Sequence, residues 1–592
     1  MGMTLIIAEK PSLGKAIAER LGIVKSGQGH LVCKQDRVVT WAFGHLFEDA
    51  TPDEYGYKQW RLEDLPIVPK QWKKNPRKDA KAQLKIIGDL LKKVQVVVHA
   101  GDPDREGQAI IDDILQHYRF SGKVWRLWLS ALDPDSVDRA LKQVKDNRDY
   151  VNFYEAAIAR KRADWLVGMN ATRYFTLKSK ERGVKTIGRV QTPTLALVVK
   201  RDMDIEHFKP LDWFTIEATI ALDSSGAFKA TWKPSAKTDE EGRCLDRAFA
   251  EQVAKKITKQ KGQIKKAETK RKKDPPPMPY YLATLQKDAN AKFGFSAQKT
   301  LEITQRLYEH HKAVTYPRTD CAWLPESQHK DAPNILKRLN LIDQWTDPSR
   351  KHKAFDDKKI TAHHAIVPTG VNPTGLSADE QKLFDLICVA YKRLFMPDHV
   401  YDATSVTFLV QDEWFTANGR VIVEEGWKLA KIKNAEDAKE KEKDEIVALP
   451  PMKTGDTGVV EKADVLNKKT EPPKRFTDGT LIEAMSRIHL VIEDETAKKV
   501  LRENAGIGTE ATRSGIIENL VKRGFLERRG KTLISTEQGR SLIQFLPDHI
   551  KSPLMTAMFE MDLADVLEGK MKSEAFLKKI EGFVENMIKE AA

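Results

Sequence analysis

The chain has 592 residues, of which 41% are hydrophobic and 31% are charged, a globular composition that excludes an intrinsically disordered chain. A chain of this length exceeds one hydrophobic core, so we expect about four domains. Lys and Arg number 99 and Asp and Glu 85, an excess of 14 positive charges that favours a polyanionic partner. No run of about 18 consecutive apolar residues occurs, which predicts no membrane-spanning helix.

Cysteine usage and the N-terminus indicate the compartment. The four cysteines (Cys33, Cys244, Cys321 and Cys388) are far apart, with no C-x-x-C pair. Zinc ribbons and disulfide frameworks are therefore not expected, and a reducing cytoplasm fits. The N-terminus runs directly into a strand pattern without the layout of a signal peptide.

The first 150 residues alternate strand and helix patterns. Residues 5–8 (LIIA) predict a short buried strand, and Pro11 opens a helix. Residues 94–99 (VQVVVH) predict a second buried strand, with a helix from Gly107 onward. Such alternation is typical of a parallel α/β domain.

The middle of the chain changes pattern several times. Residues 151–200 are predicted to be helical, and residues 211–233 alternate apolar and polar positions, which predicts antiparallel strands. Ten Lys or Arg and one acid lie between residues 255 and 273, and the proline cluster 275–279 follows; we interpret this stretch as a linker or hinge. From residue 281 to about 400 the pattern is mostly helical.

Strands are predicted again over 403–410 and 413–422. The charged stretch 431–445 has low complexity and predicts a solvated loop. The remainder is predicted to be helical, except for residues 524–535 (GFLERRGKTLIS), which indicate a hairpin after a helix, like the wing of a winged helix.

Carboxylates are predicted to gather at the ends of the two buried strands. The segment GDPDREG follows the second strand and carries Asp102, Asp104 and Glu106, and Glu9 ends the first strand. Two carboxylates about 4 Å apart repel by about 4 kcal/mol at an effective dielectric of about 20. Such a cluster is favourable only with a cation or with raised pKa values. Oxygen ligands with room for water and phosphate suit Mg²⁺; the alternative is a solvated acidic turn.

A tyrosine in the segment TYPRTD is a candidate nucleophile. Tyr316 follows a helical run and precedes Pro317, which ends helix propagation. A free phenol has a pKa of about 10, so making it a nucleophile at neutral pH means offsetting about 4 kcal/mol. Arg318 is placed to clamp a phosphate and stabilise negative charge. A tyrosine near an arginine is by itself more often only packed in the structure.

Histidine, basic and aromatic residues supply candidate DNA contacts. In AHHAIVPT, His363 and His364 point in different directions, so we expect at most one to meet a phosphate. The segment ARKRADWLVGMNATR places Trp165 and Arg173 on a predicted helix, and TIGRVQTPT is a glycine-containing loop with Arg189. Aromatic faces stack on bases while arginines follow phosphates. The alternative is a charged helix face with a buried tryptophan.

No G-x-x-x-x-G-K-[ST] motif occurs, since Gly524 lies one residue too far from Gly530-Lys531-Thr532. The sequence thus gives no sign of ATP binding through this motif.

Nine ordered segments together resemble the type IA topoisomerases, and among them the bacterial topoisomerase III subgroup. They are IIAEKPSLGKAIA, HAGDPDREG, ARKRADWLVGMNATR, GRVQTPTLALV, PPPMPYYLATLQ, TYPRTDCAWLP, AHHAIVPT, RFTDGTLIEAM and GIGTEATRSGII. The resemblance implies a multidomain α/β plus α+β fold. An N-terminal Toprim α/β domain, helical and winged-helix-like domains and an antiparallel β arch would form a torus with a central hole.

The resemblance also implies domain boundaries. They are 1–150 for the Toprim metal-binding domain, 151–210 with 463–592 for the helical DNA-binding domain, 211–272 with 395–462 for the β-rich hinge domain, and 273–394 for the domain with the nucleophilic tyrosine.

The resemblance further implies roles for individual residues. Tyr316 matches the nucleophile, which attacks a DNA phosphodiester and stays linked to the 5′ phosphate, with Arg318 beside it. His363 matches the family's histidine in A-H-x-A-I, and Lys10 is a candidate proton donor to the leaving 3′ hydroxyl. The implied Mg²⁺ ligands are Glu9, which is also catalytic, Asp102 and Asp104, with Glu106 nearby. The positions that match DNA contacts are Trp60, Trp165, Arg173, Lys180, Thr186, Ile187, Gly188, Arg189, Val190, Gln191 and Arg318.

The implied activity is that of an ATP-independent topoisomerase. It would cleave single-stranded DNA by transesterification, pass a second, intact DNA segment and religate, and so relax negative supercoils and unlink (decatenate) DNA. Exchanging a phosphodiester for a phosphotyrosine ester conserves bond energy, which accounts for the missing ATP site. We expect a monomer without membrane association in the bacterial cytoplasm, on the nucleoid or a plasmid; no helicase partner is identified.

Some features depart from the family pattern. Gln108 stands where many type IA enzymes have a further acid, and the chain stops at Ala592 without a cysteine cluster, so we expect weaker relaxation than in longer relatives. The stretch 233–247 is similar to a short version of the loop that topoisomerase III enzymes use in unlinking. Two alternatives remain: a Toprim nuclease or primase that uses only the carboxylates, and a non-catalytic single-strand-binding protein. The TYPRTD segment argues against both.

Overall fold

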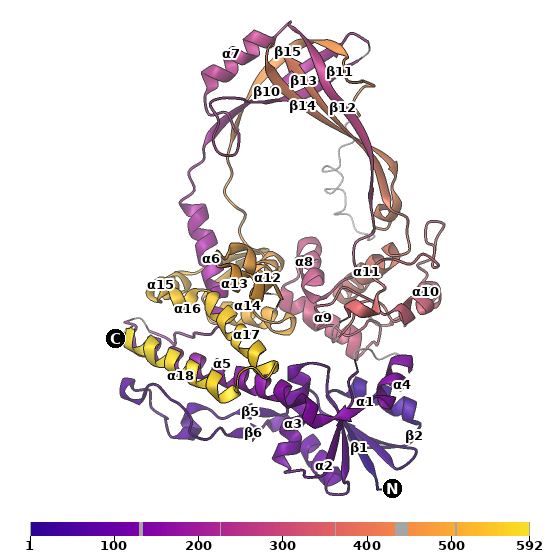
Figure 1. Ribbon diagram of the computed structural model, residues 1–592, viewed down its shortest axis with the longest axis vertical. Coiled ribbons are helices and arrows are strands. Elements are labelled where there is room, and N and C mark those ends of the chain that lie inside the picture. The colour runs from indigo at the N-terminus through magenta and orange to yellow at the C-terminus, as the bar shows by residue number, and fades with distance from the viewer. Residues whose placement is uncertain are drawn as a thin grey trace.

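The buried strands predicted near the N-terminus form the centre of an α/β sheet (Figure 1). Strand β1 (Thr4–Ala8) pairs in parallel with β7 (Val96–Ala100) on one side and with β4 (Arg37–Trp41) on the other. Alternate side chains of β1 enter two different cores, Leu5 in one and Ile6 in the other, which explains why the strand is apolar throughout. The computed structural model describes residues 2–129, 134–180, 182–224, 226–360, 363–431, 448–503 and 506–590.

The sheet has the order β2-β3-β4-β1-β7-β8-β9, with a parallel centre and antiparallel edges. Its other strands are β2 (Ile23–Gly27), β3 (His30–Cys33), β8 (Lys123–Arg126) and β9 (Lys145–Asp146). The helices of this domain are α1 (Pro11–Leu21), α2 (Lys81–Leu91), α3 (Arg105–His117) and α4 (Pro134–Lys142), and a separate ladder joins β5 (Phe47–Asp49) to β6 (Lys74–Pro76). Helix α1 begins at Pro11, as predicted, because proline lacks the N–H that a first helical turn leaves unpaired.

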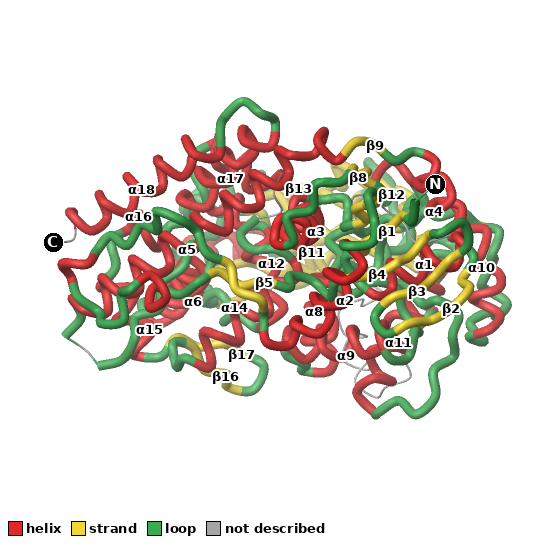
Figure 2. The backbone as a smooth tube through the Cα atoms, turned by 90° about the horizontal axis from the view of Figure 1, so that it is seen from below, coloured by secondary structure: helices red, strands yellow, loops and turns green. Residues whose placement is uncertain are grey.

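Two distant parts of the chain share one helical core in the base of the molecule. The first part is α5 (Val151–Lys178) and α6 (Gln191–Glu206). The second is α12 (Asp478–Ser486), α13 (Glu495–Glu503), α14 (Glu510–Lys522), the hairpin β16 (Leu526–Arg529) and β17 (Thr532–Ser535), α15 (Glu537–Phe545), α16 (Asp548–Lys551), α17 (Leu554–Leu567) and α18 (Ser573–Glu590). Helices α17 and α18 run beside α5 (Figure 2). The hairpin that the sequence predicts after a helix is therefore confirmed.

Six antiparallel strands close into a barrel in the order β10-β11-β14-β13-β12-β15. They are β10 (Asp212–Leu222), β11 (Ala227–Lys233), β12 (Lys261–Asp274), β13 (His399–Val410), β14 (Glu413–Glu424) and β15 (Thr457–Lys469), with α7 (Arg247–Ile257) packed against them. The interior is filled by apolar side chains from all sides, among them Ile216, Phe408 and Phe415.

Two predictions for this region were wrong. The basic stretch that was interpreted as a linker ends α7 and then forms β12, whose backbone pairs with β13 and β15. Its cations point to solvent or pair with neighbours, as Arg271 does with Asp402 at 2.9 Å. The chain after residue 463 is not helical at first, because β15 continues to Lys469. Residues 432–445 of the predicted solvated loop lie outside the described residues.

The segment 280–394, here called the tyrosine segment, has helices as its main regular elements, as predicted. Its helices are α8 (Leu282–Phe293), α9 (Ala297–Glu309), α10 (Glu326–Arg338) and α11 (Ala378–Arg393). Together with the α/β domain, the helical base and the barrel, it closes a ring around a central hole, which confirms the predicted torus (Figure 1). Within the described residues, no helix combines the length and the apolar character that crossing a membrane requires.

The barrel core allows a direct test. Trp232 is buried and its indole N–H donates to Glu413 at 3.0 Å, whereas Trp414, on the paired strand, is exposed. We expect Trp232→Ala to lower the midpoint of thermal unfolding of the barrel strongly, since removing a core aromatic costs about 3–5 kcal/mol. Trp414→Ala, the matched control, should stay within about 0.5 kcal/mol of the parent. Equal midpoints for both variants, measured by circular dichroism, would contradict this packing.

Candidate active site

Glu9 and Asp102 are brought together by neighbouring parallel strands. Ala8 at the end of β1 stands opposite Ala100 at the end of β7, so the residues that follow leave the same edge of the sheet. The backbone N–H of Asp102 donates to Glu9 Oε2 at 2.9 Å. The predicted meeting of the two strand ends is thus present, although 93 positions separate the two residues.

The segment 101–107 (GDPDREG), here called the acidic loop, runs into the first turn of α3 and is tightly packed. Asp104 caps this helix, because its Oδ1 accepts the backbone N–H of Gly107 at 2.7 Å. A Cβ atom on Gly101 would lie 2.1 Å from the carbonyl oxygen of Gly107, and one on Gly107 would lie 2.5 Å from the backbone of Asp102. Both glycines of GDPDREG are therefore required by close backbone approach.

A buried arginine supports the acidic loop from behind. Arg126 on β8 donates to the carbonyl oxygens of Gly101 at 2.8 Å and Asp102 at 2.6 Å, and to Gln108 Oε1 at 2.8 Å. Gln108, which stands at the place of a further acid, also donates to Asp112 at 2.7 Å. Sequence reasoning missed Arg126; the available signal was one arginine in an otherwise apolar run, KVWRLWL.

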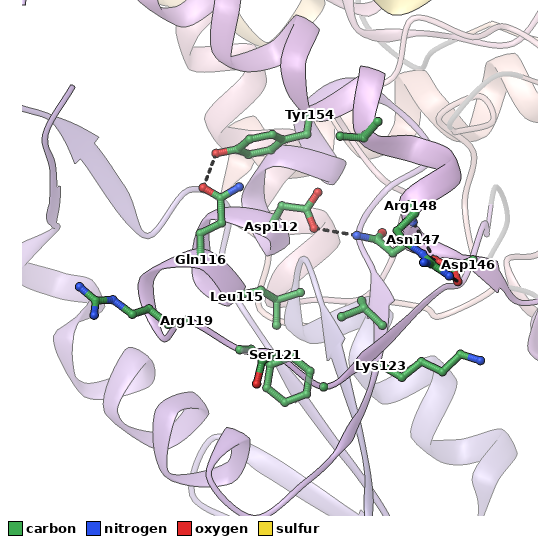
Figure 3. Close-up of a pocket in the computed structure, with 14 residues that line it drawn as sticks. Asp112, Leu115, Gln116, Arg119, Ser121, Lys123, Asp146, Asn147, Arg148 and Tyr154 are labelled. Atoms are coloured by element: carbon green, nitrogen blue, oxygen red, sulfur yellow. Dashed lines mark hydrogen bonds and ion pairs between the residues drawn. The ribbon is translucent and has the colours of Figure 1, made fainter. Parts of the chain in front are cut away.

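Asp112 in turn lines a pocket at the far end of α3. Figure 3 shows it accepting a hydrogen bond from Asn147, with Tyr154 above bonded to Gln116. None of the residues that line this pocket is among the predicted site residues. The acidic loop is thus connected through Gln108 to a pocket outside the predicted site.

Tyr316 lies directly on the acidic cluster. The Lys10 Nζ atom is 4.0 Å from the centre of its ring, and the ring of His363 lies at 4.2 Å. Both of these neighbours contact the same oxygen, Oδ2 of Asp102, Lys10 at 2.6 Å and His363 at 2.9 Å. Asp102 therefore joins the residues around the tyrosine.

Local backbone pairing positions the tyrosine beside the histidine. The N–H of Thr315 donates to the carbonyl of Val367 at 2.9 Å, so the strand-like segments before Tyr316 and after His363 run together. Tyr308 on α9 packs edge-on against Tyr316 at 5.7 Å and donates its hydroxyl to Ser12 on α1 at 2.7 Å. The tyrosine segment is thereby docked on the α/β domain.

Burial and charge set the protonation of the cluster. Burial and the neighbouring Asp102 raise the pKa of Glu9 to about 8, and burial also raises the pKa of Asp104. Burial acts to raise the pKa of Asp102 as well, but Lys10 and His363 outweigh it and hold that pKa below its usual range. Burial raises the pKa of Tyr316 to about 12, so its phenol is neutral in this DNA-free arrangement.

The donor set fits a hard divalent cation, although the ligands are not pre-assembled. Within the described residues, no group of three or more His, Cys, Asp or Glu side chains converges as a metal cluster. Asp102 is occupied by Lys10 and His363, and Glu106 by His45 at 3.2 Å. Burial and neighbouring carboxylates nevertheless raise the pKa values of Glu9 and Asp104, and carboxylate oxygens are the donors that Mg²⁺ prefers.

Comparison with known proteins identifies the family. Residues 148–578 match the family described as DNA topoisomerase, and residues 4–132 match the Toprim domain. The chain belongs to the type IA DNA topoisomerases. The resemblance seen in the nine sequence segments is therefore confirmed, and the α/β domain is a Toprim domain.

Relatives of this type IA topoisomerase carry the name DNA topoisomerase 3. The chain is 40% identical to that of Haemophilus influenzae, covering 99% of this chain and 94% of the relative, and 39% identical to that of Salmonella typhimurium, covering 100% and 93%. The structure of full-length topoisomerase I from Thermotoga maritima aligns with a TM-score of 0.69 at 22% identity, covering 99% of this chain and 90% of that one, and shows the same fold.

Arg318 and the second histidine of this topoisomerase point elsewhere. Arg318 is exposed and donates to Gln305 on α9 at 3.0 Å, so the phosphate clamp expected beside Tyr316 is not formed in this arrangement. His364 contacts Gln328 at 3.2 Å. Of the two adjacent histidines, only His363 meets the tyrosine.

The tryptophans predicted to contact DNA lie in different environments. Trp60 is 37% exposed and stacks under the guanidinium of Arg173, and Lys180 is also exposed. Trp165 is only 7% exposed, and its indole N–H donates to the carbonyl of Ala50 at 3.0 Å. The predicted stacking of Trp165 on a base is thus wrong for this structure, because its ring is part of the helical core.

The loop 186–191 is held between α5 and α6. Thr186, Gly188, Val190 and Gln191 are partly exposed, whereas Ile187 is buried in the helical core. Arg189 is also buried, pairing with Asp164 at 2.8 Å and with Glu560 at 3.1 Å. The loop presents its backbone and small side chains, and its arginine is engaged inside the protein.

Sequence reasoning also missed Glu560 on α17. It pairs with Arg105 at 2.9 Å and lies 3.8 Å from Arg160, in addition to its contact with Arg189. Burial acts against its ionisation, but the three arginines lower its pKa to about 2. The available signal was a lone acid on the apolar side of LMTAMFEMDLADVL.

The two tryptophans give opposite expectations. Trp165→Ala should lower the thermal unfolding midpoint, since loss of a core aromatic costs about 3–5 kcal/mol. Trp60→Ala should leave that midpoint nearly unchanged and weaken binding of a single-stranded oligonucleotide by about 1–3 kcal/mol, the effect of one lost base stack. Fluorescence anisotropy measures the binding. Undiminished affinity of the Trp60 variant would exclude that contact.

Proposed function

We propose that this topoisomerase cleaves single-stranded DNA through Tyr316, passes an intact second DNA segment, and religates the strand, thereby relaxing negative supercoils and unlinking DNA. The observation that best supports the proposal is the contact of Tyr316 with Lys10 and His363, both bound to Asp102. A tyrosine with only a packing role does not require two cationic or proton-carrying groups on its ring. The family and the ring-shaped fold support the same activity.

In the forward step, the Tyr316 hydroxyl oxygen attacks the phosphorus of a backbone phosphodiester. The bond from phosphorus to the 3′ oxygen breaks, and the 5′ phosphate becomes a phosphotyrosine. The phenol loses a proton and the 3′ oxygen gains one, so the step releases no net proton. Asp102 keeps Lys10 protonated, because it raises the pKa of the lysine against the effect of burial. Lys10 is therefore placed to protonate the 3′ oxygen.

His363 and Arg318 have separate proposed roles. His363, held by Asp102 and packed on the tyrosine ring, is positioned to donate to a phosphate oxygen at the nucleophile. Arg318 would turn from Gln305 towards the phosphate when DNA enters, since their hydrogen bond is exposed and easily exchanged for a charge-assisted one. Both groups would stabilise negative charge that builds up during transfer.

Mg²⁺ is the proposed cofactor. Glu9, Asp102 and Asp104 would hold it, with Glu106 nearby. When bound, the ion supplies positive charge for the phosphate oxygens around the reacting bond. Its charge would also oppose the rise in the pKa of Glu9 that burial and neighbouring Asp102 cause.

Strand passage requires the ring to open at the docked tyrosine. The proposed moving unit is the domain 273–394, which would carry the 5′ end away from the Toprim domain while the barrel strands act as the hinge. The contacts to be separated include those of Tyr308 with Ser12 and of His363 with Asp102. The central hole would take the intact segment. No ATP is needed, because the phosphotyrosine conserves the energy of the broken bond.

The loop proposed for unlinking is short and ordered. Within 233–247, Cys244 bridges to Phe214 on β10, and Asp239 pairs with Arg243 at 2.7 Å. We propose this loop as the element that favours unlinking over relaxation.

Tyrosine chemistry is tested with a 3′-labelled single-stranded oligonucleotide and denaturant-trapped products. The wild type should shift the label to a protein-linked species, and Tyr316→Phe should form none, because it lacks the attacking oxygen. Tyr308→Phe is the control: it loses one hydrogen bond worth about 1 kcal/mol and should still form the adduct. Free labelled ends from the Tyr316 variant would instead establish a nuclease that uses only the carboxylates.

Metal dependence is tested on negatively supercoiled plasmid. Chelation of the metal by EDTA should abolish relaxation by the wild type. Tyr316→Phe should still bind an oligonucleotide, because binding depends on basic groups. Asp104→Asn should raise the Mg²⁺ concentration for half-maximal relaxation at least about tenfold, the size of effect seen when metal-site groups are lost. Asp112→Asn, on the same helix but in the far pocket, should keep the parent requirement. If the parent, Asp104→Asn and Asp112→Asn all required the same Mg²⁺ concentration for relaxation, Asp104 would not be a metal ligand.

A further inference from the structure

Three arginines from distant parts of the chain surround one buried carboxylate. Arg105 lies in the acidic loop, Arg160 on α5, and Arg189 in the loop before α6. Glu560 on α17 lies 2.9 Å from Arg105, 3.8 Å from Arg160 and 3.1 Å from Arg189. Glu560 is 455 positions away from Arg105 in the sequence, so their ion pair links the C-terminal helices to the acidic loop.

The cluster is electrically balanced without DNA. Besides Glu560, two carboxylates contact its arginines: Glu106 lies 3.7 Å from Arg160, and Asp164 lies 2.8 Å from Arg189. Three positive charges thus face three negative ones. Removing the charge of Glu560 would leave an excess of one cation beside the acidic loop.

One side of the cluster is closed and the other is open. The Glu560 side chain is 6% exposed beneath the arginines, whereas that of Glu106 is 47% exposed. Within the described residues, the guanidinium of Arg160 forms ion pairs but no hydrogen bond, because both of its carboxylate distances exceed 3.5 Å. The Arg160 side chain is 16% exposed, so a ligand that approaches from the side of Glu106 reaches part of the guanidinium.

Helix α17 fixes Arg189 at two points. Thr556 donates its hydroxyl to the carbonyl of Arg189 at 3.0 Å, and Glu560, one helical turn later, binds the guanidinium. Both side chains are buried. The helix thereby sets the backbone and the side chain of this arginine together, a stronger constraint than a single ion pair provides.

We propose that Glu560, anchored by buried Arg189, is a positioning residue that holds Arg105 and Arg160 in place for the backbone of the bound strand, and that its charge limits how tightly this strand is held. The inference rests on the proposed cleavage of single-stranded DNA. A strand that must be cleaved, moved and released is served by arginines that are fixed in position but largely neutralised. The chemistry recognised is a phosphodiester oxygen approaching the open side.

Two substitutions of Glu560 separate its effect on strand affinity from its positioning of the arginines: one removes the charge and the other moves it. Glu560→Gln keeps the size of the side chain and one acceptor oxygen but deletes the charge. Glu560→Asp keeps the charge but withdraws it by one methylene. Asp562→Asn is the matched control, because it changes net charge equally on the same helix, where Asp562 pairs only with Lys579 among the described residues, at 2.9 Å.

Binding of a fluorescent oligothymidylate is measured in the Tyr316→Phe background, in EDTA, at several salt concentrations. We expect Glu560→Gln to bind about fivefold more tightly at low salt. Its plot of log affinity against log salt should be steeper by about 0.7, the contribution of one additional neutralised phosphate on a single strand. Asp562→Asn and Glu560→Asp should keep the parent slope.

Adduct formation with Tyr316 intact tests the positioning. Glu560→Asp should form several-fold less covalent adduct than the wild type, although it binds the oligonucleotide equally well. Unchanged or weaker binding by Glu560→Gln at the parent slope overturns the charge effect, and wild-type adduct yield from Glu560→Asp overturns the positioning. If Glu560→Gln fails to fold, as judged by circular dichroism, the Asp variant decides alone. Failure of the wild type to form any adduct would instead refute the proposed cleavage itself.

Discussion

The ionised carboxylate of Asp102 is the interaction on which the active site depends. It is buried, yet two groups on one of its oxygens keep its pKa low: Lys10 from the Toprim domain and His363 from the tyrosine segment. Because these two groups also contact the side chain of Tyr316, the same carboxylate positions the proposed nucleophile and joins two parts of the ring-shaped molecule. Closure of the molecule and assembly of the site are therefore one event. A site built at a domain contact is complete only when the ring is shut, and under the proposed mechanism this would confine cleavage to the closed ring.

The acidic loop has to be held in place by other groups, because several of its residues are carboxylates. Carboxylates close together repel, and no local sequence feature holds them there. The protein fixes the loop through neutral and cationic groups at its back: the amide of Gly107 on Asp104, and buried Arg126 on the carbonyls of Gly101 and Asp102. In this arrangement the carboxylates of Glu9 and Asp104 are buried next to another carboxylate, and both have raised pKa values. The surrounding structure holds these carboxylates in an unfavourable arrangement, which an incoming cation would stabilise.

Much of the fold could be predicted because its elements have local causes. The strand LIIA is apolar throughout since alternate residues enter two cores, and the wing hairpin is marked by Gly530 in a short turn. Strand β12 could not be predicted, because its cations are solvated while its backbone is paired to segments far away in sequence. Trp165 was misassigned for a related reason: the same aromatic residue beside arginines suits a base stack or a core, and only the packing of Trp72 and Tyr55 against it decides.

The candidate site also contains residues that a local pattern predicts and residues that depend on distant partners. The carboxylates and the tyrosine were found because each lies in a segment whose residue types together indicate chemistry. Arg126 and Glu560 were not, because each is a single charged residue on the buried side of its element, and the partners lie 18 to 455 positions away. Such residues are costly to bury unless they are paired, so their presence in a core is itself a sign of a distant partner. In this chain each of the two residues has at least one partner in the acidic loop: Gly101 and Asp102 for Arg126, and Arg105 for Glu560. An isolated charge within an apolar element is therefore a useful pointer to the support of an active site, even where the sequence cannot say which segment it supports.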